Sequence, residues 1–351
     1  MNNKKIPALL IVALLFAASG SALRAWDYEG HRIVNQLALA ALPTDFPAFV
    51  REGDNPGRIA FLAGEPDRWR NNSDLPIKHY NGVDHYLDLE QLADAGLTPA
   101  TVSPLRYVFV TQYASARSVH PANFADIDPA KNSDRSREWP GFAPWAITEY
   151  YGKLKSAFSY LKAFEEAGGT VEEVENARAN IVYLMGVMGH YVGDCAQPLH
   201  TTIHHNGWVG DNPQGYTKWS GIHSWIDGGF IAKAGITADG IVARVTVAQP
   251  LALVPGADGR DPFFVATMDY LLEQHKQVEP LYVLEKRDVF KADQAATSVE
   301  GRAFIEGQLL KGGEMLGAIW VTAWRAAFPD TYLRAQLLKR QMAVAPAKKA
   351  P

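Results

Sequence analysis

Two pairs of histidine and aspartate are the residues best placed to do chemistry. His190 and Asp194 lie four residues apart, and His223 and Asp227 repeat this spacing. On a helix, side chains four residues apart share one face, so each pair presents an imidazole beside a carboxylate. A further imidazole, His200, follows the first pair. Imidazole nitrogens and carboxylate oxygens are ligands that zinc and similar divalent metals prefer, so the sequence predicts a metal site.

The N-terminus has the features of a secretory signal peptide. Two lysines at positions 4 and 5 precede an apolar run over residues 6–18, and small residues follow it. The apolar run is short for a membrane span, which favours cleavage over retention as an anchor. Cleavage after Ala22 and after Ala25 both fit the pattern; with the second, residues 1–25 are the signal peptide and the mature chain begins at Trp26. We therefore expect a secreted or periplasmic protein with no transmembrane segment after cleavage.

The mature chain is acidic, which limits what it can bind through charge alone. The precursor has 34 Lys and Arg against 38 Asp and Glu, for a net charge of −4. Removal of residues 1–25 takes away two lysines and one arginine and no acid, so the balance becomes 31 against 38, or −7. Such a chain has no general attraction for polyanions, so positive charge for a phosphate must be local, and a bound metal is the obvious source. The single cysteine, Cys195, excludes an internal disulfide and is expected to be a small buried residue.

Helical periodicity dominates the chain and strand-like alternation is scarce, so the predicted class is all-α. We expect helices at 30–42, 56–70, 104–116, 144–166, 171–195, 220–234, 262–286 and 297–326. Polar loops are predicted at 71–83, 118–143 and 201–219, with a short extended or turn segment from His85 to Asp88. The 118–143 loop is long enough to border a site and to shape a substrate groove. Residues 342–351 are predicted to form a disordered tail.

A mature N-terminus at Trp26 would add further ligands. The α-amino nitrogen and carbonyl oxygen of one residue can chelate a metal in a five-membered ring, and His31 lies five residues on. The motifs then follow in order along the chain as Trp-x-x-x-Gly-His, an Asp, His-Tyr-x-Asp, His-x-x-x-Asp-x-x-Gln-Pro-Leu-His and His-x-x-x-Asp. In this order and spacing the chain resembles the S1/P1 nuclease family, which shares its fold and its trizinc site with bacterial zinc phospholipase C.

The resemblance implies a single compact helical domain over residues 26–341, with three zinc ions as its cofactors. Their ligands would be Asp67, His85, His190 and Asp194 for the first ion; His200, His223 and Asp227 for the second; and the amino nitrogen and carbonyl oxygen of Trp26, with His31 and Asp194, for the third. Asp194 would bridge the first and third ions. Three carboxylates offset half of the charge of three zinc ions, so the residual positive charge would attract phosphate.

The resemblance also implies an activity. A water held between zinc ions would attack a phosphodiester, and Asp67 is the candidate catalytic residue that orients or deprotonates this water. Cleavage of the P–O3′ bond would give products with 5′-phosphates, with a preference for single-stranded DNA or RNA as the substrate. No stable protein partner is implied.

The substrate class depends on weaker signals, because nucleases and phospholipases of this type share the metal ligands. Arg70, Tyr86 and Asp88 stand where nucleases have a basic residue for phosphate, an aromatic that stacks on a base and an aspartate that hydrogen-bonds the base. Alternatively, Arg70 is a solvated helix end, Tyr86 packs in the core and Asp88 caps a helix.

Three departures from the nuclease pattern keep other functions open. The Gly-Gly-Asn motif of many nucleases is absent, and no polar side chain follows Asp227, where two glycines stand instead. Glu29 resembles an acidic residue that contacts the choline head group in phospholipase C. The alternatives are therefore a zinc-dependent phospholipase C-like hydrolase and, further off, a metal-binding helical protein without catalysis.

Overall fold

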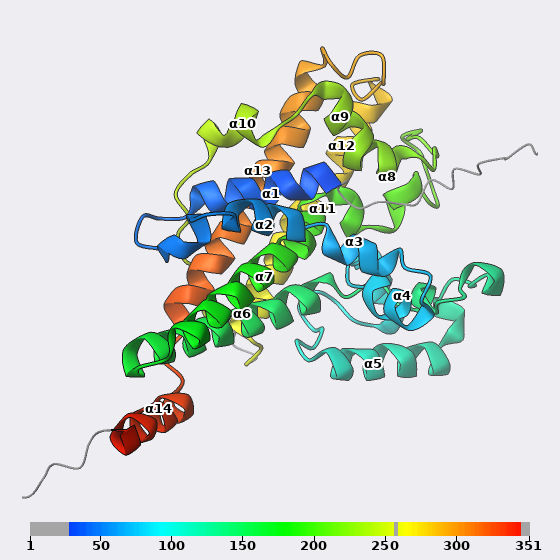
Figure 1. Cartoon of the computed structure of the whole chain (residues 1–351). Coiled ribbons are helices and arrows are strands. Elements are labelled where there is room, and N and C mark those ends of the chain that lie inside the picture. The colour runs from blue at the N-terminus through cyan, green and yellow to red at the C-terminus, as the bar shows by residue number, and fades with distance from the viewer. Residues whose placement is uncertain (1–27, 256–258, 345–351) are drawn as a thin grey trace, which may run out of the picture.

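Long helices that carry aliphatic and small residues form the centre of this computed structural model (Figure 1), which describes residues 28–255 and 259–344. The predicted signal peptide and Trp26 lie outside the described residues. The helices are α1 (Tyr28–Ala41), α2 (Asn55–Leu62), α3 (Glu65–Arg70), α4 (Leu75–Gly82), α5 (Arg106–Val119), α6 (Ala143–Ala167), α7 (Val171–Ala196), α8 (Ile222–Ser224), α9 (Phe230–Ala234), α10 (Ala238–Ile241), α11 (Pro262–His275), α12 (Val278–Lys286), α13 (Val299–Ala326) and α14 (Thr331–Val344).

Helices α1, α6, α7 and α13 pack against one another and bury their apolar faces in one continuous core. Helix α1 approaches α13 closely because α13 carries glycines at the contact. A Cβ built on Gly313 would lie 2.6 Å from the Cβ of Leu37, and one built on Gly317 would lie 3.2 Å from the Cβ of Ala41. Apart from Gly, every residue would push the two helix backbones apart, so these glycines set the depth of α1 in the fold.

The other face of α1 is tied to α2 and α7 by one buried amide. The side-chain nitrogen of Asn35 donates to the carbonyl oxygens of Ile59 in α2, at 2.8 Å, and Gly186 in α7, at 3.0 Å. A Cβ on Gly189 would lie only 1.7 Å from the side-chain oxygen of Asn35, so α7 needs a glycine there. This contact holds the N-terminal half of α1 beside the C-terminal half of α7, where the predicted ligands lie.

Helix α7 begins at a capping box and runs for 26 residues. The Thr170 hydroxyl accepts from the Glu173 backbone, and the Glu173 carboxylate accepts from the Thr170 backbone. Both bonds satisfy donors that a helix N-terminus leaves free. Because the helix is continuous to Ala196, it carries both His190 and Asp194 on one face, as the four-residue spacing predicts.

The all-α prediction is confirmed, and the described residues form one all-α domain. They contain no β-strand, and a single isolated bridge joins Leu87 to Gly141. Most predicted helices are present, but two are interrupted. The predicted helix 56–70 divides into α2 and α3 at Gly64, where a Cβ would lie 2.6 Å from the Tyr28 ring. The predicted helix 262–286 divides into α11 and α12.

Three helices differ from the sequence predictions, and the shortest of them is α10 over Ala238–Ile241, where no helix was expected. Residues 71–83 were expected to be a loop, but they contain α4, which begins after Asp74 with Pro76 in its first turn. Proline is favoured at this position of a helix, so the segment that reads as polar still starts one. Helix α14 was not expected, and it reaches into the predicted tail as far as Val344. It is held to the start of α7 by the Arg340–Glu173 ion pair, with Nη1 and Oε1 2.8 Å apart.

The remaining loop predictions are closer to the structure. Segment 118–143 lacks a long helix between α5 and α6 and contains only short 3₁₀ turns. The predicted helix 220–234 is nearly continuous, but a π-helical turn over Trp225–Gly229 separates α8 from α9. Among the described residues, no helix combines the length and the apolar character that a membrane crossing requires. Residues 345–351 lie outside the described part of the chain.

Candidate metal centre

Three groups of buried histidine and aspartate side chains meet near the C-terminal end of α7. The first cluster is Asp67, His85 and His190; the second is His200, His223 and Asp227; the third is His31, His190 and Asp194. Within each cluster the potential ligand atoms lie within 4.8 Å of one another. The described residues therefore contain three groups that are each able to hold a metal ion.

These side chains come from separate parts of the chain. Helices α1 and α3 each supply one residue, and α7 supplies two, as their packing against α7 allows. His85 follows α4, and His200 lies in the 3₁₀ turn Pro198–Thr201 directly after α7. The second cluster is completed by His223 in α8 and Asp227 in the π-helical turn. Of the nine predicted ligands, the structure brings together eight, and Trp26 lies outside the described residues.

Asp194 lies at the centre of the arrangement because its two oxygens face different clusters. Its Oδ2 is 3.0 Å from His85 Nδ1 and 3.2 Å from His190 Nε2, both in the first cluster. Its Oδ1 is 3.4 Å from His31 Nε2 in the third cluster. Two ligands about 2.0–2.1 Å from one tetrahedral ion stand roughly 3.3 Å apart, so these spacings fit shared coordination. This is the geometry expected of a bridging carboxylate.

The other predicted ligands have similar spacings. In the first cluster, Asp67 Oδ1 is 3.9 Å from His190 Nε2 and 4.0 Å from His85 Nδ1. In the second cluster, His223 Nε2 is 2.9 Å from His200 Nε2, and 3.1 Å from Asp227 Oδ2. In each of these two clusters, the ligand atoms therefore surround a centre of their own.

Several buried polar atoms of the clusters make no hydrogen bond. Those that face a cluster include Nε2 of His31, Oδ1 of Asp194 and Oδ2 of Asp227. Buried polar atoms are nearly always hydrogen-bonded, because leaving one unpaired costs about 1–3 kcal/mol. A cation coordinated by the lone pairs that face each centre would repay this cost. The donor set thus fits bound metal.

Neighbouring groups orient the ligands. His190 Nδ1 donates to the Ala63 carbonyl oxygen at 2.7 Å, and His200 Nδ1 donates to the His85 carbonyl oxygen at 2.8 Å. In both rings this leaves Nε2 free to face a metal, as is usual for metal-binding histidines. The Gln197 amide donates to Asp227 Oδ1 at 2.5 Å, and its oxygen accepts from the Leu199 backbone at 2.7 Å. Sequence reasoning assigned Gln197 no role, although it belongs to the Gln-Pro-Leu-His motif.

The electrostatics favours the protonation states that metal binding needs. Burial alone would raise the pKa of Asp194, but His190 and His200 hold this pKa well below its usual range. Burial lowers the pKa of His31 and of His85 well below the usual value, so both rings are neutral. Ionised carboxylates and neutral imidazoles are the forms that ligate metals. His200 differs, because Asp194 and Asp227 outweigh its burial and raise its pKa to about 9.

A cleft of about 310 Å³ opens beside the second cluster. His200 and His223 line it together with the three predicted substrate residues, Arg70, Tyr86 and Asp88. The structure therefore brings these three side chains to the same cavity as two potential metal ligands. Seven further residues, to which sequence reasoning assigned no substrate role, also line it: Gln91, Ser136, Arg137, Trp139, Leu199, His205 and Asn206. Three of them, Ser136, Arg137 and Trp139, lie in loop 118–143, which the sequence predicted to shape a substrate groove.

The surroundings of Arg70 and Asp88 weigh against their structural alternatives. Arg70 is not a solvated helix end: its Nε lies 2.8 Å from Asp67 Oδ1, and its side chain is 15% exposed. Asp88 precedes the 3₁₀ turn Leu89–Ala95 but makes no capping hydrogen bond with its side chain. Asp88 is 6% exposed, and its Oδ1 has no hydrogen-bond partner. The ring of His205 lies nearby, with its Nδ1 3.8 Å from this oxygen. A buried carboxylate oxygen that accepts no hydrogen bond at the edge of a cleft suits a ligand that donates one.

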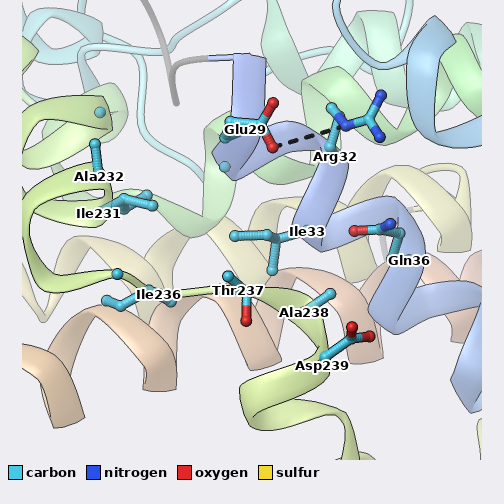
Figure 2. A pocket seen from close by; sticks show the side chains of 13 residues that line it. Glu29, Arg32, Ile33, Gln36, Ile231, Ala232, Ile236, Thr237, Ala238 and Asp239 are labelled. Atoms are coloured by element: carbon cyan, nitrogen blue, oxygen red, sulfur yellow. Dashed lines mark ion pairs between the residues drawn. The ribbon is translucent and has the colours of Figure 1, made fainter.

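Glu29, one of the features that kept the phospholipase alternative open, lies in a different cavity (Figure 2). This second cavity, of about 380 Å³, lies between the first turns of α1 and the segment from α9 to α10. It shares no lining residue with the cleft. The Glu29 carboxylate is turned toward Arg32, with Oε2 and Nε 3.8 Å apart. Glu29 is therefore already paired and does not line the cleft.

The comparisons with known proteins add no family to this picture. No protein-family model matches the chain, and no curated protein matches it significantly. The inference of function therefore depends on the residues themselves. The firm finding is a multi-metal arrangement of buried His and Asp, consistent with a metalloenzyme.

Proposed function

We propose that this protein is a secreted or periplasmic zinc-dependent phosphodiesterase of the S1/P1 nuclease type, which cleaves single-stranded nucleic acid. The observation that carries the proposal is the placement of Asp88, a buried carboxylate whose Oδ1 accepts no hydrogen bond, in the cleft that His200 and His223 also line. This placement supports a substrate site beside a metal centre, because potential metal ligands and a potential hydrogen-bond acceptor line the same cavity.

Zinc is the metal we propose for the three clusters. All the ligands of the described residues are imidazole nitrogens and carboxylate oxygens, and no thiolate is among them. Zinc accepts such ligands in tetrahedral geometry and leaves a position open at catalytic sites. Asp67, His85, His190 and Asp194 would hold one ion, and His200, His223 and Asp227 a second. His31 and Asp194 would hold the third, with the amino and carbonyl groups of Trp26 if cleavage follows Ala25.

Zinc in such a site supplies Lewis acidity toward a phosphoryl oxygen and makes water a nucleophile near neutral pH. The chain supplies proton transfer and orientation. Burial raises the pKa of Asp67 above its usual value, although Arg70 opposes this rise. A carboxylate that binds a proton more readily is a better acceptor for the proton of an attacking water, so we assign this role to Asp67. Arg70 then holds a phosphate oxygen in the cleft.

Nucleic acid suits the cleft better than a choline lipid does. The Asp88 oxygen that makes no hydrogen bond can accept from an N–H or O–H donor, and nucleobases carry amino and imino groups. A quaternary ammonium head group has no hydrogen to donate and would contact the carboxylate and the nearby rings only through charge and cation–π attraction. Tyr86 offers an aromatic ring beside this acceptor, on which an unpaired base stacks without the cost of opening a duplex.

A direct test compares substrates and products. Purified mature protein loaded with zinc would be given end-labelled single-stranded DNA and RNA, duplex DNA of the same sequence, and phosphatidylcholine vesicles. We expect cleavage of both single strands, slower cleavage of the duplex and products with 5′-phosphates. Hydrolysis of phosphatidylcholine without cleavage of oligonucleotides would replace the proposal with the phospholipase alternative. Products with 3′-phosphates would contradict the assigned bond, and fewer than two zinc ions per chain would contradict the metal centre.

A further inference from the structure

One wall of the cleft is the end of the long segment between α5 and α6, which is fixed to the residues around His85. The Asp88 backbone donates to the Pro140 carbonyl oxygen at 2.7 Å, and the Phe142 backbone donates to the Val83 carbonyl oxygen at 2.7 Å. Gly141 lies between them with a φ of 111°, and a Cβ there would lie 2.0 Å from the Tyr86 carbonyl oxygen. Only glycine permits this approach. The segment therefore has a fixed position beside Tyr86.

A buried asparagine fixes the part of this wall that carries Arg137. Asn132 is 8% exposed; its Oδ1 accepts from the Arg137 backbone, and its Nδ2 donates to Glu138 Oε1, each at 3.1 Å. The Arg137 side chain is also held, because its Nε donates to the Lys131 carbonyl oxygen at 2.8 Å. Its guanidinium is thus oriented before any ligand binds, which reduces the entropy cost of binding.

Arg137 differs from the other arginine of the cleft in its charge balance. Arg70 is paired with Asp67, whereas no carboxylate pairs with Arg137 within residues 28–255 and 259–344. Arg70, Arg137 and Tyr86 all line the cleft. The two cations therefore lie near the same aromatic ring, and the charge of Arg137 is available to an anion.

We propose that Arg137 binds the phosphate of a neighbouring nucleotide when a single strand lies in the cleft. Arg137 is then a specificity-determining residue that makes the site prefer polynucleotides over small phosphodiesters. This inference rests on the proposed nuclease function. A guanidinium recognises phosphate with charge-assisted hydrogen bonds. A strand presents another phosphate at each nucleotide beyond the scissile bond, whereas a small diester or a phosphatidylcholine molecule presents only one.

The test compares two arginines of the same segment. Arg137→Gln removes the cleft arginine that has no carboxylate partner. Arg135→Gln is the matched control, because Arg135 is 70% exposed, pairs with Glu138 and does not line the cleft. Steady-state kinetics would be measured on a 12-nucleotide single strand and on bis(4-nitrophenyl) phosphate. Affinity for a phosphorothioate strand that resists cleavage would be measured by fluorescence anisotropy over a range of salt concentrations.

For Arg137→Gln we expect KM for the strand and Kd for the phosphorothioate strand to rise about five- to tenfold, with kcat nearly unchanged. The slope of log Kd against log salt concentration should change by about 0.7, the value for one phosphate contact on a single strand. Turnover of the small diester should stay within twofold of wild type, as should all values for Arg135→Gln. If Arg137→Gln behaves like the control, or if both substrates lose activity equally, this inference is wrong while the nuclease function stands. If the wild type turns over the small diester but not the strand, both fail.

Discussion

The central role of Asp194 leads to a quantitative prediction about metal content. Its Oδ2 lies 3.0 Å from His85 Nδ1 and its Oδ1 3.4 Å from His31 Nε2, so it belongs to two potential metal sites. Asp227 belongs only to the second cluster. Asp194→Asn should therefore cost the protein two ions, whereas Asp227→Asn, the matched control, should cost one. Elemental analysis after dialysis against buffer with trace zinc would count the ions per chain.

The same difference should appear in stability. An ion that binds only the folded state stabilises it by about 2.7 kcal/mol when its free concentration is 100 times its Kd. Loss of two such ions would remove about 5 kcal/mol of metal-dependent stability, and loss of one about 3 kcal/mol. Urea unfolding with zinc and with chelator, measured for each variant, isolates this quantity, because effects of the substitution on metal-free protein cancel.

Equal loss of ions in the two variants would refute the bridging role. So would an Asp194→Asn variant that keeps three ions and the full difference in stability between zinc and chelator. Loss of more ions in Asp227→Asn than in Asp194→Asn would mean that the bridging carboxylate is Asp227 and not Asp194.

Three further predictions concern the residues around the centre. Gly189→Ala should destabilise the fold by about 2–4 kcal/mol in urea unfolding, because the new Cβ overlaps Asn35. Gly152→Ala, which has open space at its Cβ, should be neutral or stabilising by up to about 1 kcal/mol. Similar values for both would contradict the packing argument. Gln197→Ala should weaken zinc binding at the second cluster about 10–100-fold in a competitive chelator titration, because Asp227 loses the donor that orients it. Unchanged affinity would mean that other contacts hold Asp227. Burial raises the pKa of Asp84 to about 6 despite its arginine partner, so the folded state binds the proton more tightly than the unfolded state does. The free energy of unfolding of the wild type, relative to that of Asp84→Asn, should therefore fall between pH about 4 and about 6. A rise over this window would contradict the raised pKa.

Sequence spacing determined the parts of this protein that depend on one helix. A helix repeats about every 3.6 residues, so His190 and Asp194 had to share a face once α7 formed. His223 and Asp227 meet across the junction of α8 and a π-helical turn. Apolar periodicity likewise identified α1, α6, α7 and α13. It failed at α4 and α14. Helix α4 lies in a polar segment, and α14 is held mainly by contacts with α6 and the start of α7 that no local pattern records.

Only the tertiary structure decided what these local pieces do together. Asn35 and the glycines of α7 and α13 fix α1 at a depth that brings His31 to Asp194, 163 positions later in the chain. No spacing rule carries information over that separation, because it depends on how closely two helix backbones approach. The same holds for Asp88, whose sequence position fits both a helix cap and a ligand site; only the folded chain places its oxygen, which accepts no hydrogen bond, beside the cleft. Residue types and short spacings thus determined the ligands, and close packing decided which of them meet.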